Sequence, residues 1–424
     1  MVEPRRTNEV FVAGRYPAHT YNPRDARRQE TELNRYLEDE GKALTVSGPS
    51  KSGKTVLLEH NLAAHSTIWI NGTDLRSVAD FWDKIIDWYG LYDIIGTQQQ
   101  TGGTGSGSIR GQLGIPGVGH IGAEVGGGYT STNTNTATRS RNAGEVAVQA
   151  LRDLPVPIVI DDFHYVDAAL KLDLTRIVKA LIRITHVVMI AVPHEAFEAV
   201  RQEPDMNGRI WNLTILPWEQ DELLEISRTG FPLLNLTDPN EVVGQKLSEV
   251  SMGAPFLMQQ LCLDYCLERD IFATLPKPTE LSVEDDWPAF FKRVADRIVP
   301  GVFDALSRGP RTHGQERSER HLKDRSGVTD IYGAILYSIS KLGPVRTVPY
   351  LTLTHKIDEL FVEAPQSQQV TSSLGHMANI ARDARGAGDA ALDYKNDELH
   401  ILDPFLSFYL RYGSWQLPAP QGKR

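Results

Sequence analysis

The sequence Gly-Pro-Ser-Lys-Ser-Gly-Lys-Thr at residues 48–55 narrows the choice of fold more than any other segment. It has the pattern G-x-x-x-x-G-K-[ST] and lies between a short apolar stretch, residues 43–47, and a helical pattern at residues 56–62. Gly48 and Gly53 let the backbone curl so that successive N–H groups point inward, and the helix start adds a dipole that favours an anion. The segment therefore predicts a strand, a phosphate-binding loop and a helix, in that order.

The residue types in this loop indicate the phosphate chain of ATP, together with Mg²⁺. Lys54 would place a point charge on the β- and γ-phosphates, and the Thr55 hydroxyl would bind Mg²⁺. The rest of the loop would contribute mainly backbone N–H groups. The predicted nucleotide-binding residues here are Gly48, Pro49, Ser50, Lys51, Ser52, Gly53, Lys54 and Thr55.

Two adjacent acids follow a second apolar strand, Ile158-Val-Ile-Asp161-Asp162. Ligands of open α/β sheets bind outside the carboxyl ends of the strands, so we expect both side chains beside the phosphate loop. Asp161 would complete the Mg²⁺ shell, and Asp162 would orient or deprotonate the attacking water. The alternative is that the two acids only cap the next helix.

Two further polar residues lie at strand ends. His194 follows the apolar strand at residues 186–192, where it would sense the γ-phosphate or serve only as a loop or capping residue. Arg209 directly precedes a fifth strand at residues 210–216. It would reach the γ-phosphate of a neighbouring subunit as a catalytic arginine, or form a local salt bridge.

Near-continuous apolar strands alternate with helices up to residue 216, which predicts a parallel sheet covered on both faces. A chain of 424 residues exceeds what one core usually supports. We expect three domains: an α/β domain at residues 1–232, a helical lid at 233–282 and a C-terminal domain at 283–424. In the last, three helical patterns precede a hairpin pattern, the order of a winged helix.

Residues 96–142 interrupt the α/β pattern. Twelve of the thirty residues from 101 to 130 are glycine, and a Ser/Thr/Asn tract follows. Such a composition buries too little apolar area to offset its ordering entropy, which predicts a flexible insertion. An alternating stretch at residues 121–125 leaves open a hairpin that orders in an assembly.

The overall composition argues against several classes of protein. A net charge of −10 disfavours a whole-surface binder of polyanions. No apolar run is long enough to span a membrane, and the two cysteines cannot form a disulfide framework. We expect a cytoplasmic location, with Cys262 and Cys266 packed on one face of a helix rather than bound to metal.

These motifs resemble the AAA+ superfamily, and within it the STAND branch and the related archaeal-type ATPases. The resemblance rests on Tyr21-Asn-Pro-Arg24, on residues 48–55, on residues 158–162, and on Gly253-Ala-Pro255, which is similar to the G-x-P motif of STAND lids. The resemblance spans nearly the whole chain outside residues 96–142.

The resemblance implies a sheet of order 5-1-4-3-2, adenine held near Tyr21 and Arg24, a lid that closes through Pro255, and oligomerisation through the nucleotide domains. Many AAA+ motors carry glutamate where this chain has Asp162, and the lid shows no clear arginine. Both departures favour a slow switch over a fast motor. No sensor repeats or effector domain are visible, so a separate partner protein would supply the output.

The sequence thus predicts an ATPase, a regulatory switch whose nucleotide state controls assembly with a partner, in bacterial defence or signalling. The alternative is a DNA-associated AAA+ loader that binds DNA through its winged helix. The segment 369–385 holds His376, Arg382 and Arg385 but also Asp383, so its basic character is thin. A third hypothesis is a scaffold that binds ATP without turnover.

Overall fold

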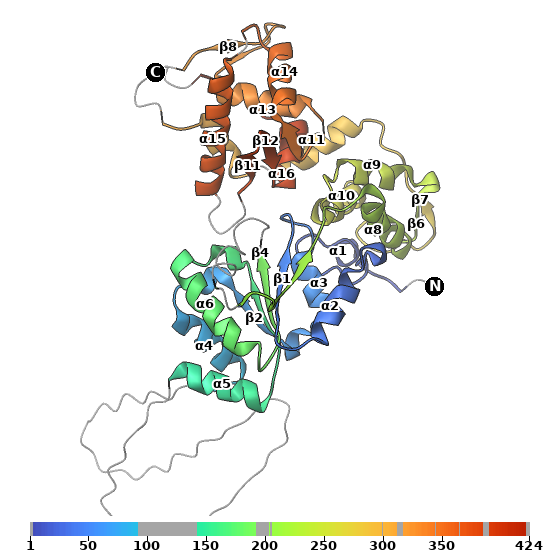
Figure 1. The fold of residues 1–424 in the computed structure, drawn as a ribbon. Helices are drawn as coiled ribbons and strands as arrows, with labels where there is room; N and C mark the ends of the chain where they lie inside the picture. Colours follow the sequence, from blue (N-terminus) through green and yellow to red (C-terminus); the bar gives the residue numbers. More distant parts are fainter. Residues whose placement is uncertain are drawn as a thin grey trace, which may run out of the picture. The chain divides into compact units, whose positions relative to one another are not determined.

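The computed structural model divides into two compact units, each built from separate chain segments (Figure 1). Unit 1 comprises residues 1–33, 46–61 and 213–424, and unit 2 comprises residues 34–45 and 62–212. The insertion at 96–142, apart from Asn142, and His194 lie outside the described residues. The structure describes residues 3–91, 142–191, 203, 206–298, 300–311, 317–343, 345–363, 365–384 and 390–420.

A five-stranded sheet has the strand order β2-β3-β4-β1-β5, which confirms the predicted order 5-1-4-3-2. Strands β2, β3 and β4 are parallel neighbours, with Ile68 opposite Ile158 and Ile158 opposite Val187. Every residue of β1 and β4 is buried, as their apolar sequences require. The strands are β1 (Ala43–Ser47), β2 (Ile68–Asn71), β3 (Ile158–Asp161), β4 (Val187–Ala191) and β5 (Ile210–Thr214).

The helices of unit 2 cover the sheet with amphipathic faces. Ser77 caps α4 by accepting the backbone N–H of Asp80, whose carboxylate accepts the N–H of Ser77 in return. Gly144 lets α5 approach α4, since a Cβ there would lie 3.1 Å from the Trp82 ring. The unit contains α4 (Val78–Trp88), α5 (Ala143–Asp153), α6 (Ala168–Leu181) and the short turns η2 (Ala64–Ser66), η3 (Gly72–Asp74) and η4 (Phe163–Tyr165).

Unit 1 begins with a short N-terminal region and the helix after the phosphate loop. Helix α2 (Gln29–Leu37) and strand β1 each cross from one unit to the other. The remaining elements of this region are α1 (Thr7–Val10), η1 (Asp25–Arg27) and α3 (Lys54–Asn61).

Three helices follow β5, and we call them the lid helices; the first of them ends at the residue where the predicted lid, 233–282, begins. They are α8 (Gln220–Leu233), α9 (Val242–Val250) and α10 (Pro255–Leu267), accompanied by η6 (Pro239–Glu241) and by the paired strands β6 (Leu236–Thr237) and β7 (Thr279–Glu280). Pro255 opens α10, where its missing N–H costs no helical hydrogen bond. Cys262 and Cys266 are fully buried on α10, as packing residues would be, and burial raises the pKa of the Cys266 thiol to about 12.

We call residues 287–420 the C-terminal region. It contains the three predicted helices and the predicted hairpin, and a third strand, β10, makes an antiparallel sheet of order β10-β12-β11. Its helices are α11 (Trp287–Ile298), α12 (Phe303–Arg308), α13 (Ile331–Lys341), α14 (Tyr350–Leu360), α15 (Ser367–Asp383) and α16 (Pro404–Tyr412). Its strands are β8 (Arg320–His321), β9 (Val328–Thr329), β10 (Thr347–Pro349), β11 (Leu392–Lys395) and β12 (Glu398–Ile401).

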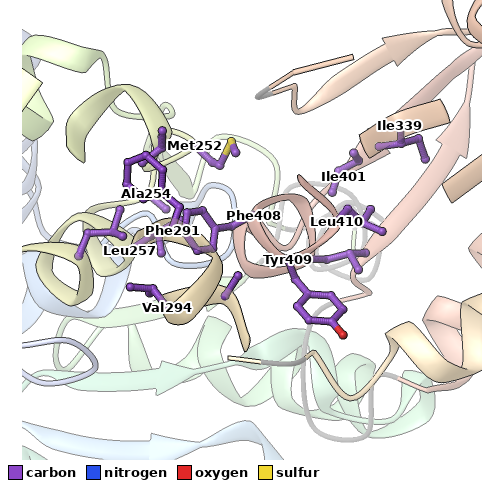
Figure 2. Close-up of a cluster of buried hydrophobic side chains, with 14 of the residues drawn as sticks. Met252, Ala254, Leu257, Phe291, Val294, Ile339, Ile401, Phe408, Tyr409 and Leu410 are labelled. Carbon is purple, nitrogen blue, oxygen red and sulfur yellow. The ribbon is translucent and has the colours of Figure 1, made fainter. Parts of the chain in front are cut away.

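One apolar core runs from the lid helices into the C-terminal region (Figure 2). Phe291 of α11 packs edge to face against Phe408 of α16, with ring centroids 6.2 Å apart. The same cluster contains Met252 and Leu257 from the lid and Ile401 from β12. The core is therefore continuous across residue 282, where the sequence predicts a domain boundary. None of the helices in the described part of the chain is long and apolar enough to cross a membrane.

Candidate nucleotide-binding site

The loop between β1 and α3 needs its glycines for steric reasons. A Cβ on Gly48 would lie 2.6 Å from the carbonyl oxygen of Ile215, a contact that a side chain cannot make. Gly53 has φ +90°, in the region that favours glycine, and Lys51 is also left-handed with φ +61°. Local backbone geometry thus gives residues 48–53 the curled form that the motif predicts.

Two polar groups of the loop point to an anionic ligand. The Lys54 ammonium donates to the carbonyl oxygens of Gly48 and Pro49, both at 2.9 Å, which holds its charge inside the loop. Ser52 is only 3% exposed, and its hydroxyl has no hydrogen-bond partner among the described residues. Buried polar atoms are rarely left unsatisfied, so a phosphate oxygen fits this hydroxyl.

The segment expected to hold adenine packs on the helix behind the phosphate loop. The Tyr21 ring stacks on the His60 ring with centroids 4.1 Å apart, and its hydroxyl donates to Glu30 at 2.7 Å. Burial, and then the hydrogen bond to Glu30, raise the pKa of Tyr21, so its hydroxyl stays protonated. Tyr16 joins the same cluster through a 2.6 Å hydrogen bond between its hydroxyl and Nδ1 of His60.

Arg24 holds this segment in place through buried contacts. Its guanidinium donates to Glu222 at 2.7 Å and to the carbonyl oxygens of Leu216 and Pro217 at 3.2 Å, and its side chain is 2% exposed. Burial alone would raise the pKa of Glu222, but hydrogen bonds from Arg24, the Glu219 backbone and Arg27 outweigh burial and lower it. The Arg24 side chain thus has a positioning role that the sequence does not reveal.

Trp218, which follows β5, contacts both the phosphate loop and the lid. Its indole N–H donates to the carbonyl oxygen of Ser52 at 2.8 Å. Its backbone N–H donates to the carbonyl oxygen of Gly253 at 3.2 Å. The Arg24 guanidinium lies 4.8 Å from the centre of its ring. The sequence signal for this residue is only Pro217-Trp218 at the end of a strand, which predicts the edge of the sheet and no contact with the loop.

The two acids belong to unit 2. Asp161 ends β3, and its carboxylate accepts the N–H of Asp162 at 2.8 Å. Asp162 is left-handed, with φ 54°. Gly72 packs against this turn, because a Cβ there would lie 2.4 Å from the Asp162 carbonyl oxygen. In the sequence, Asn71-Gly72 indicates only the end of a strand and gives no sign of this contact.

Substitution of Gly72 is therefore expected to disturb the acidic turn. Gly72→Ala should lower the free energy of unfolding by about 1–3 kcal/mol, because the added methyl group overpacks the site. Gly375→Ala is the control: it lies on α15 with no atom within 4 Å of its Cβ position, and alanine suits helices better. Denaturant unfolding measures both, and equal effects would contradict the steric argument.

Arg209 lies at the amino end of β5 in unit 2. Its N–H donates to the Met206 carbonyl oxygen at 3.0 Å, and its own carbonyl oxygen accepts the N–H of Ala43 at 2.9 Å. Its side chain is half-buried, and within the described residues no carboxylate pairs with its guanidinium. A local salt bridge, the alternative role for Arg209, is therefore not found among the described residues.

The predicted Mg²⁺ ligands, the Thr55 hydroxyl and the Asp161 carboxylate, are hard oxygen donors of the kind that Mg²⁺ prefers. In the described ranges no group of three or more His, Cys, Asp or Glu side chains is placed to hold a metal ion. A Mg²⁺ ion that keeps several water ligands needs no such group.

No known family model matches the sequence, and no curated protein matches it either. Among solved structures, the chain is similar to the ORC2 protein of Aeropyrum pernix in its ADPNP–ADP complexes, with 14% identity, 95% of both chains covered and a TM-score of 0.51. It also matches the Walker-type ATPase PABY2304 of Pyrococcus abyssi, with 15% identity, 90% and 94% of the two chains covered and a TM-score of 0.47. A third match is Cdc6p from Pyrobaculum aerophilum, with 12% identity, 95% and 96% covered and a TM-score of 0.42. The likeness to ORC2 extends over almost the whole chain and shows an α/β P-loop fold.

Proposed function

We propose that the protein is an ATP-binding and slowly hydrolysing switch of the AAA+ type, whose nucleotide state controls its assembly. The observation that carries this proposal is the phosphate loop. Its curled backbone, the Lys54 charge inside it and the unsatisfied buried hydroxyl of Ser52 together suit a chain of phosphates. The ORC2 likeness supports the fold that this chemistry needs.

The acids of β3 would complete the site. The phosphate loop follows β1, Asp161 ends β3 and Asp162 follows it, and both strands belong to one sheet. Ligands of open α/β sheets bind outside the carboxyl ends of the strands. Asp161, with Thr55, would hold Mg²⁺, which when bound neutralises charge on the phosphates. Asp162 would hold and orient the attacking water and accept its proton.

Contacts with the adenine base and with the lid complete the proposed site. Tyr21 and Arg24 lie in the segment that would border adenine, and Pro255 opens the lid helix that would close over it. His194 would sense the γ-phosphate, as its place in the sequence after an apolar strand predicts. These four roles rest on the resemblance and on sequence position.

Arg209 would act on the nucleotide of a neighbouring copy. The Arg209 backbone lies beside Ala43, the first residue of β1, whereas the phosphate loop follows Ser47, the last. The two ends of this five-residue strand are about 16 Å apart. A side chain at this end of the strand is better placed to reach the nucleotide of a neighbouring subunit than the nucleotide of its own subunit. The proposal thus includes a homo-oligomer formed through the ATPase domains. A separate partner protein would respond to its nucleotide state, in bacterial defence or signalling.

Removal of the loop cation tests the central claim. Lys54→Ala is expected to weaken ATP binding by about 10-fold or more, because the variant loses the charge that the loop holds inward. Calorimetric titration is the measurement. The control is Lys246→Ala, which breaks only a surface ion pair with Glu249. Equal affinity in the two variants would exclude the phosphate loop as the binding site.

The charges on α15 do not favour DNA binding through the C-terminal region. The exposed face of α15 carries Gln368, Thr371 and Asn379, and its Arg382 lies 3.7 Å from the Asp393 carboxylate. A face with so little net positive charge contributes little to phosphate attraction. Salt-dependent binding to duplex DNA would revive this candidate.

A further inference from the structure

The turn that opens helix α10 is held from two sides. On one side, Trp218 donates its backbone N–H to Gly253. On the other, Arg346, which precedes β10 in the C-terminal region, donates its Nε–H to the carbonyl oxygen of Met252. A Cβ on Gly253 would lie 3.0 Å from the Trp218 carbonyl oxygen and 3.3 Å from the Arg346 guanidinium. Met252 and Gly253 are both left-handed, with φ 52° and 63°, so the turn has little freedom to adjust.

A second link joins the phosphate loop to the C-terminal region. The Lys51 ammonium lies 4.9 Å from the ring centre of Phe256 and 5.7 Å from that of Phe405. The two rings pack edge to face, with centroids 5.1 Å apart, and come from α10 and α16 respectively. Lys51 has no carboxylate partner among the described residues, so the two rings are its main attraction there.

The hydrogen bond from Trp218 fixes the direction of one peptide group in the loop. The C=O of Ser52 points to the Trp218 indole. In a planar trans peptide the N–H lies opposite the C=O, so the N–H of Gly53 points away from the indole, to the other side of the backbone. In a phosphate loop, inward-pointing N–H groups are the groups that bind the ligand.

We propose that Trp218 is a positioning residue that aims the Gly53 N–H into the phosphate loop, and that the C-terminal region stabilises this arrangement through Arg346 and Phe405. The inference rests on the proposed function, because it assumes that the loop binds the phosphates of a nucleotide. It adds that nucleotide affinity depends on Trp218, 166 positions beyond Ser52, and on two residues still farther along the chain. The docked C-terminal region thereby favours retention of bound nucleotide.

Trp218→Phe separates this role from packing, since phenylalanine keeps an aromatic ring for Arg24 but lacks the indole N–H. We expect ADP and ATP to bind roughly 3- to 10-fold more weakly, the effect of one neutral hydrogen bond, while adenosine binds unchanged. The matched control is Trp415→Phe, which removes an indole hydrogen bond to the Leu410 carbonyl oxygen in the C-terminal region. Competition against a fluorescent ADP analogue measures all three ligands.

The outcomes are distinct. If the unmodified protein fails to bind ATP, the proposed function is wrong. If it binds, but Trp218→Phe weakens ADP and adenosine equally, or leaves ADP affinity like that of Trp415→Phe, the positioning role is overturned.

A double-mutant cycle tests the link to the C-terminal region. Arg346→Met keeps an unbranched chain that reaches about as far as Nε and removes the donor to Met252. If Arg346 acts through Trp218, the variant that carries both Trp218→Phe and Arg346→Met should bind ADP no more weakly than whichever single variant has the lower ADP affinity. Additive losses would overturn the link. Should Arg346→Met not fold, a second cycle with Lys51→Met and Phe405→Leu tests the link through the contact between these two side chains. Losses of ADP affinity that do not add support the link, and additive losses overturn it.

Discussion

An Arg209→Ala variant is expected to bind ATP as the unmodified protein does, yet to stay monomeric with ATP and Mg²⁺ and to hydrolyse ATP on the order of 10³-fold more slowly. A guanidinium in trans stabilises charge that develops on the transferring phosphoryl group, and an arginine of this kind is worth about 10³–10⁵ in rate. Because the contact needs both ATP and a neighbour, its loss also uncouples assembly from nucleotide. Light scattering and phosphate release measure the two effects.

The control for Arg209→Ala is Arg152→Ala, an exposed arginine on α5 of the same unit. Mixing the Arg209 variant with an Asp162 variant gives a sharper test. Each damages a different half of a shared site, so interfaces that pair an intact Arg209 with an intact Asp162 should regain some turnover. Mixed oligomers without any recovery would assign Arg209 to the structure of its own subunit.

An Asp162→Asn variant should keep its affinity for ATP while hydrolysis falls by roughly 10²-fold or more. The amide cannot accept the proton of the attacking water, whereas its size is unchanged. Asparagine also tolerates the left-handed backbone that Asp162 adopts, at φ 54°, so the turn should survive the substitution. Single-turnover phosphate release and ATP titration together separate chemistry from binding.

The same variant should accumulate the ATP-bound assembly, which light scattering detects. Asp173→Asn, an exposed acid on α6, serves as the control. Unaltered phosphate release in Asp162→Asn would leave this residue as a structural acid of the turn after β3.

The strands could be predicted because most are short, nearly continuous apolar runs, and their order followed from the resemblance to AAA+ ATPases. The three C-terminal helices and their hairpin were likewise visible as periodic patterns. Strand β10 was not: it has three residues, one of them Pro349, and it exists only because it pairs with β12 about 50 residues later. Non-local pairing leaves no periodic trace in so short a segment.

The candidate site divides in the same way. The residues proposed to bind phosphate and Mg²⁺ lie in two short runs, 48–55 and 158–162, so motifs identify them. The residues that hold them do not: the Trp218 bond to Ser52 spans 166 positions, and the Arg24 bond to Glu222 spans 198. Nothing in the sequence around Arg24 indicates that its guanidinium is buried against a carboxylate. Such supports become visible only when the chain is folded.

The apolar core that passes from Met252 and Leu257 to Phe291 and Phe408 has a practical consequence (Figure 2). A chain truncated near residue 282 would expose these side chains to water and is expected to aggregate. Cleavage of the peptide bond there by a protease should leave the two fragments associated, because the buried contacts do not depend on chain continuity. Amide hydrogens of α10 and α16 should exchange at similar rates, since opening either helix exposes the same core.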